Sequence, residues 1–123
     1  MQPLCAPQRR HPRVPLEVPV HVTSIDAEAD QEGRPCFRAS LERCTNVSLG
    51  GAGLVTAEPL PPGRRVLLGF ELPDGTSFET IGRVSWSRSV VEAGGRLAAG
   101  CGIEFLEPGR ERPRLWEWLG RAA

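Results

Sequence analysis

The sequence predicts an all-β protein with a terminal helix, namely a six-stranded antiparallel β-barrel capped by a C-terminal α-helix. Three observations predict this fold. Several short segments alternate apolar and polar residues, as half-buried strands do. The 123 residues include 14 glycines and 12 prolines, which favour many turns. Residues 112–119 have the apolar spacing of a short amphipathic helix. Six short strands fit a closed barrel because closure leaves no exposed sheet edge.

The first part of the chain predicts a strand, a connection and a second strand. Val20 and Val22 alternate with polar neighbours, and Pro19 indicates an edge or a bulge because proline cannot donate to a ladder. Residues 25–35 are acidic and rich in turn formers, so we expect a solvated connection. Residues 36–44 alternate again and predict the second strand.

The remaining strands are separated by clear turn signals. Gly50-Gly51 is expected to reverse the chain sharply, and Asp74-Gly75 is a strong hairpin signal. In the strand after this hairpin, Phe78, Ile81 and Val84 are expected to point inward. These later strands are predicted at 53–56, 65–72, 77–89 and 97–105.

Arginines concentrate positive charge near the N-terminus, at Arg9, Arg10 and Arg13. Pro12 and Pro15 exclude a helix here, since each proline pushes its predecessor out of the helical region. Guanidinium forks suit phosphate oxygens and guanine edges better than lysine does. Taken alone, the cluster is more typical of a solvated tail.

A second polar motif is the segment Asn46-Val47-Ser48-Leu49-Gly50-Gly51. It offers an amide, a hydroxyl and a backbone that a ligand can approach closely. The same residues are good turn formers, and both interpretations hold together. With the arginine cluster, the motif predicts a small nucleotide-binding site made of a flexible arm and a tight loop.

This pair of motifs resembles the PilZ family, the bacterial domains that bind cyclic di-GMP. R-x-x-x-R is followed by N-x-S-x-x-G, with asparagine in place of the aspartate that the family often has first. The strand entry at 13–20, the hairpin at 72–75 and the segments 82–86 and 102–105 are also similar, so the resemblance covers residues 8–119. It implies a PilZ-like split barrel with its helix over residues 14–123, preceded by a flexible arm, residues 1–13.

The resemblance also implies a binding site for cyclic di-GMP. The arginines would fold over the barrel and grip guanine edges and phosphates, opposite a wall formed by the second motif. Trp86 is either a stacking surface for a purine or a core tryptophan. Gln8 stands where family members that bind a stacked ligand pair often have arginine, which implies one ligand per chain. The implied site residues are Arg9, Arg10, Arg13, Asn46, Ser48, Gly50, Gly51, Trp86 and Arg88.

The sequence predicts neither a catalytic site nor a metal site. His11 and His21 have no triad pattern around them, and the acidic residues are not grouped as metal ligands. The four cysteines are scattered without C-x-x-C, so we expect reduced, structural thiols. Binding without turnover, and without a cofactor, is therefore expected.

Charge and hydropathy limit the classes of partner and the location that we expect for this protein. The formal net charge is 0, which does not suggest DNA or another polyanion. No apolar run approaches the roughly 20 residues that cross a bilayer, and no apolar segment follows the N-terminal arginines as in a signal peptide. We therefore expect a cytoplasmic protein with no membrane insertion.

Three hypotheses for function follow. The leading one is a cyclic di-GMP receptor that changes conformation or partner binding when the arm orders on the ligand. The second is a PilZ-like adaptor in motility or pilus function that does not bind nucleotide. The third, a nucleic-acid-binding barrel, is disfavoured by the charge. We expect an unidentified protein partner, and a monomer or weak dimer.

Overall fold

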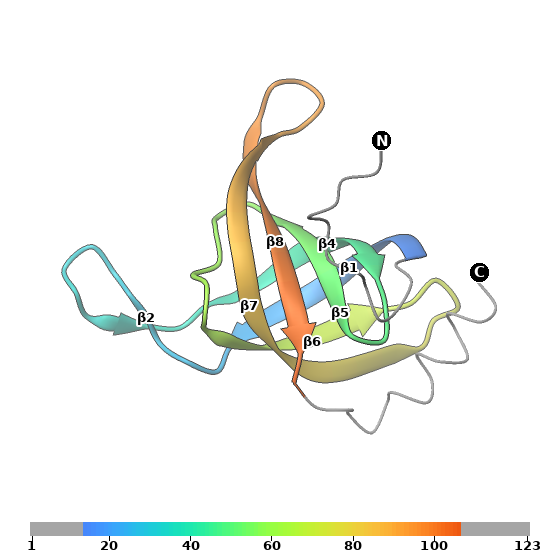
Figure 1. The fold of residues 1–123 in the computed structure, drawn as a ribbon, viewed down its shortest axis with the longest axis horizontal. Coiled ribbons are helices and arrows are strands. Elements are labelled where there is room, and N and C mark those ends of the chain that lie inside the picture. The colour runs from blue at the N-terminus through green and yellow to red at the C-terminus, as the bar shows by residue number, and fades with distance from the viewer. Residues whose placement is uncertain (1–13, 107–123) are drawn as a thin grey trace, which may run out of the picture.

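Six antiparallel strands close into a barrel in the computed structural model, which describes residues 14–106. The strands follow one another around the barrel in the order β1-β4-β5-β8-β7-β6 (Figure 1). Their bounds are β1 Val14–Ser24, β4 Ala39–Val47, β5 Gly51–Thr56, β6 Arg65–Glu71, β7 Ser77–Val91 and β8 Leu97–Phe105. The six-stranded antiparallel barrel is thus confirmed. The helix predicted at 112–119 lies outside the described residues. Within 14–106, no helix is long and apolar enough to cross a membrane.

Two short strands form a hairpin outside the barrel, where the sequence predicted only a solvated connection. They are β2 Glu28–Ala29 and β3 Pro35–Cys36, and the hairpin projects to one side (Figure 1). Arg38 ties its base to the barrel. Its Nη2 donates to Glu28 Oε1 at 3.1 Å and to the Pro59 carbonyl at 3.0 Å. The single strand predicted at 36–44 is observed as two strands, because β3 ends at Cys36 and β4 begins only at Ala39.

The barrel interior is apolar and follows the alternation of the strands. Phe70 and Phe78 stack inside it with ring centroids 4.6 Å apart. Ile81 does not point inward as expected, because residues 78, 80, 82 and 84 occupy the buried positions of β7. The core residues are Val18, Val20, Val22, Cys44, Val47, Leu49, Ala52, Leu54, Leu60, Val66, Leu68, Phe70, Leu72, Phe78, Val84, Ala99, Cys101 and Ile103.

Two β-bulges interrupt the alternation on either side of β5 and β8. In β4, Cys44 pairs with Leu54 but Asn46 pairs with Gly53, so Thr45 is an extra residue. In β7, Val84 pairs with Ile103 but Trp86 pairs with Gly102. A single extra residue moves the following side chains to the opposite face of the sheet. Asn46 and Trp86 would otherwise point into the core.

Candidate functional site

The two bulges bring Asn46 and Trp86 onto one row of the barrel's outer face. The row runs across adjacent strands, from Asn46 on β4 through Gly53 and Gly102 to Trp86 on β7. We call these four residues the platform. Pro15 pairs with Asn46 at the other end, so β1 begins beside the platform. Residues 1–13, which lie outside the described part of the chain, precede this start of β1 in the sequence.

Trp86 lies on the surface, and its indole lies over Gly102 of the neighbouring strand β8. Trp86 is 45% exposed, which excludes the interpretation that it is a core tryptophan. The Arg88 guanidinium carbon lies over the indole, 5.0 Å from the ring centroid, as a cation–π contact requires. Arg88 and Trp86 are two residues apart, so both side chains point to the outer face.

The loop between β4 and β5 is a tight turn held by Ser48. The Ser48 N–H donates to the Gly51 carbonyl at 2.8 Å, and the Gly50 N–H donates to Ser48 Oγ at 3.1 Å. Ser48 is only 4% exposed, so its hydroxyl shapes the turn from inside. Direct contact of this hydroxyl with a ligand stays a prediction.

Gly51 of this turn allows close packing against β8. Neither Gly50 nor Gly51 has a positive φ, so the reversal expected there needs no left-handed backbone. A Cβ on Gly51 would overlap the Ile103 carbonyl oxygen of β8. Glycine is thus required because two backbones approach closely at this point.

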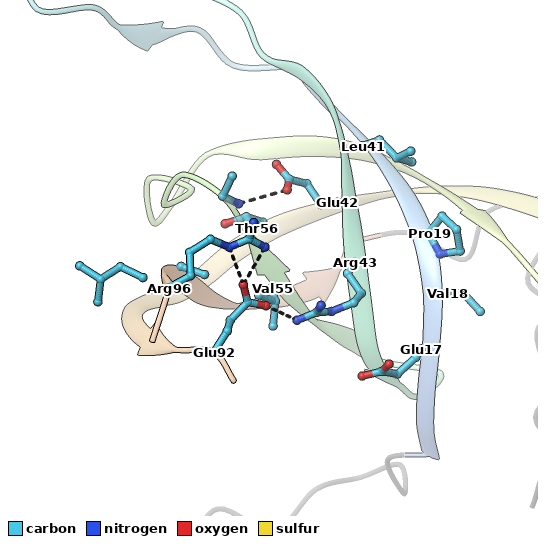
Figure 2. Close-up of a pocket in the computed structure, with 13 residues that line it drawn as sticks. Glu17, Val18, Pro19, Leu41, Glu42, Arg43, Val55, Thr56, Glu92 and Arg96 are labelled. Carbon is cyan, nitrogen blue, oxygen red and sulfur yellow. Dashed lines mark hydrogen bonds and ion pairs between the residues drawn. The ribbon is translucent and has the colours of Figure 1, made fainter. Parts of the chain in front are cut away.

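An open groove of about 630 Å³ lies on the same outer face as the platform. Figure 2 shows the residues that line this groove. The next row along the strands runs from Arg43 through Val55 and Gly100 to Arg88. Glu92, from the turn between β7 and β8, reaches across to this row. It accepts hydrogen bonds from Arg43 at 2.5 Å and from Arg96 at 3.0 Å. These bonds, that of Arg43 first, lower the pKa of Glu92.

Acidic groups balance the arginines around this groove. Its lining contains Glu17, Glu42 and Glu92 against Arg43 and Arg96. Arg43 is moreover already paired with Glu92. The groove therefore offers little surplus positive charge to an anionic ligand.

The structure brings together most of the residues that the sequence singled out. Asn46 lies near the end of β4, Ser48 and Gly50 lie in the turn, and Gly51 begins β5. Trp86 and Arg88 lie on β7, on the same outer face as Asn46. Arg9, Arg10 and Arg13 lie outside the described residues, so their part in the site stays a prediction.

Two kinds of residue beside the candidate site carry no signal in the sequence. Gly53 lies under the Asn46 amide and Gly102 under the Trp86 indole. The sequence of a strand does not indicate which side chain of a neighbouring strand covers its glycine. Arg43 and Glu92 are 49 residues apart in the sequence, and they meet because β4 and the β7–β8 hairpin lie on either side of β5. Among residues 14–106, no cluster of histidine, cysteine and acidic side chains could hold a metal ion.

The family model and the solved structures that match this chain point to one family. The family model for the PilZ domain matches residues 7–119. The c-di-GMP-bound PilZ domain of YcgR from Escherichia coli is 19% identical, with a TM-score of 0.62 over 89% of this chain and 86% of that chain. The K. pneumonia MrkH–c-di-GMP complex is 16% identical, with a TM-score of 0.66 over 93% of this chain and 52% of that chain.

A third structure, the Bacillus subtilis inhibitor of motility MotI/DgrA, is 19% identical, with a TM-score of 0.63 over 98% of this chain and 56% of that chain. The chain thus spans about half the length of MrkH and MotI. No curated protein matches it. At these identities the solved structures establish a shared fold, while the family model covers nearly all of the sequence. The chain belongs to the PilZ domain family.

Proposed function

We propose that this protein is a cyclic di-GMP receptor that binds the dinucleotide without turning it over. PilZ domains bind cyclic di-GMP as a regulatory ligand, and the YcgR and MrkH structures named above contain it. The proposed site comprises the platform, the Ser48–Gly51 turn and Arg88, completed by Arg9, Arg10 and Arg13 of the arm.

The observation that carries the proposal is the outward placement of Asn46 and Trp86 by two separate bulges. Bulges are common next to functional sites, where they re-aim a side chain. An exposed indole offers a face on which a guanine can stack, worth about 1–3 kcal/mol per base in comparable systems. The Asn46 amide has both donors and acceptors for a guanine edge.

The phosphates explain why the arm should take part. The groove beside the platform has more carboxylates than guanidinium groups, so it cannot neutralise two phosphates. The arm supplies three arginines and joins the barrel beside Asn46. We expect residues 1–13 to order over the ligand, which couples binding to a change that a protein partner can recognise. Stronger hydrogen-exchange protection of these residues with ligand is the expected sign.

Calorimetric titration of the whole chain tests the proposal. We expect saturable binding of cyclic di-GMP, and none of GTP or single-stranded RNA at the same concentration. Trp86→Ala should weaken binding by about 1–3 kcal/mol. Phe37→Ala is the matched control, because Phe37 is an exposed aromatic residue, 68% accessible, away from the platform.

Absence of cyclic di-GMP binding to the wild-type chain would contradict the proposal. It would favour the alternative, a PilZ-like adaptor in motility or pilus function that acts through protein contacts alone. Equal losses in the two aromatic variants would leave a receptor whose site is not the platform.

A further inference from the structure

The Trp86 indole lies face-down on the backbone of β8. A Cβ built on Gly102 would come within 2.5 Å of Trp86 Cε2 and 2.8 Å of Cδ1, and closer still to Nε1. These are three neighbouring atoms of the five-membered ring at similar distances, so the ring presents its face to Gly102 and not its edge. Real Cβ atoms do not come this close to other heavy atoms. Any side chain at position 102 would therefore lift or turn the indole.

The Asn46 amide has the same relation to β5. A Cβ on Gly53 would lie 2.6 Å from Asn46 Nδ2 and 3.1 Å from both Cγ and Oδ1. Gly53 and Gly102 are paired across β5 and β8. The amide and the indole thus lie flat on adjacent strands, each on its own glycine.

The backbone itself gives no reason for glycine at these positions. Neither Gly53 nor Gly102 has a positive φ, so other residues could adopt their conformations. Glycine in a strand interior is unfavourable and often marks a place where another group approaches closely. Here the approaching groups are the two planar side chains of the platform.

We propose that Gly102 is a positioning residue of the ligand site, with Gly53 as its counterpart under Asn46. Gly102 lets Trp86 lie flat, so that β8 closes one indole face and the other is presented outward as a stacking surface for a purine. Arg88 lies against the ring in this structure, so a base that stacks here displaces the guanidinium or stacks upon it. The inference rests on the proposed function for its ligand.

The test is Gly102→Ala, with Gly69→Ala as its matched control. Gly69 also lies on the outer face of a barrel strand, but a Cβ there would make only ordinary contacts, 3.7 Å from His21 Cβ and 3.9 Å from Glu79 Cγ. Two quantities are measured: cyclic di-GMP affinity by calorimetry, and the indole N–H NMR signal of Trp86 without ligand. Loss of that signal in Trp86→Phe assigns it.

We expect Gly102→Ala to weaken binding roughly 5- to 100-fold and to move the Trp86 signal, while Gly69→Ala changes neither. In a Trp86→Ala background, Gly102→Ala should cause no further loss of affinity. An additional loss there, or an unmoved Trp86 signal in the single variant, would overturn the inference.

Two further outcomes are also decisive. If Gly102→Ala does not fold, folding of the Trp86→Ala/Gly102→Ala double variant would support the inference, and failure of both would overturn it. If the wild-type chain does not bind cyclic di-GMP, the proposed function fails. The ligand-free Trp86 signal still decides whether Gly102 positions the indole.

Discussion

Replacement of Ser48 by alanine separates two roles that the N-x-S-x-x-G motif combines. In the structure the Ser48 hydroxyl accepts the Gly50 N–H at 3.1 Å and lies 3.4 Å from the Gly51 carbonyl. The carbonyl keeps its 2.8 Å bond from the Ser48 N–H in the variant. The main loss is therefore one acceptor, that of the Gly50 N–H.

A single hydrogen bond contributes about 0.5–1.5 kcal/mol to stability. Because Gly50 is only partly buried, water can approach its N–H once the hydroxyl is gone. We expect Ser48→Ala to lower the free energy of unfolding by about 1 kcal/mol. Urea denaturation should show a lower midpoint with an unchanged slope.

The affinity for cyclic di-GMP should fall only modestly in Ser48→Ala, as a consequence of the loosened turn. Ser77→Ala, at an exposed position that begins β7, should change neither stability nor affinity. A variant with wild-type stability and severely weakened binding would refute this reasoning, because the hydroxyl would then act on the ligand and not on the turn.

The remaining predictions concern the arm, the number of ligands and pH. Arg9→Ala or Arg13→Ala should remove most cyclic di-GMP binding, since charge-assisted bonds contribute about 1.5–3 kcal/mol each; wild-type affinity by calorimetry in both variants would contradict this. Wild type should bind one ligand per chain, because Gln8 adds no charge for a second, and Gln8→Arg should move the titration midpoint towards two. Hydrogen bonds from Arg65 lower the pKa of Asp26 from 3.8 to about 2, so this ion pair stabilises the fold above pH 4 and the stabilisation is lost as pH falls towards 2. Acid unfolding of Asp26→Asn should accordingly be less steep in that range than that of wild type, and identical profiles would argue against the pair.

The parts of the fold that the sequence predicted well are those in which alternation is uninterrupted. The last strand was predicted at 97–105 and is observed with those bounds. Val20 and Val22 are buried as expected. Pro19 fits its predicted place, since it follows a bulge in β1 and precedes the stretch that pairs with β6. In these segments the alternation of apolar and polar residues agrees with the inward and outward positions that the barrel requires.

The candidate site was harder to predict because the outward placement of its side chains depends on breaks in that alternation. Asn46 and Trp86 are each two residues from a buried neighbour, Cys44 and Val84, so strict alternation assigns both to the core. Only the N-x-S-x-x-G motif suggested a place in a binding site for Asn46, and the sequence left open whether Trp86 lies in the core or at the site. The bulges that turn both side chains outward are defined by pairing with β5 and β8, and this pairing is not visible in the sequence of either bulged strand.

The charge distribution links these observations to the proposed division of the chain into arm and barrel. A formal net charge of 0 gave no reason to expect an anionic ligand. In the structure, Arg43 beside the candidate site is paired with Glu92, while Arg88 lies over the Trp86 ring and keeps its charge. Around the candidate site, the barrel face therefore offers planar surfaces for bases, but Arg88 alone is a weak positive charge for two phosphates. Because the arginines of the arm carry further positive charge, neither part should hold the dinucleotide well alone, and binding should require that the two come together.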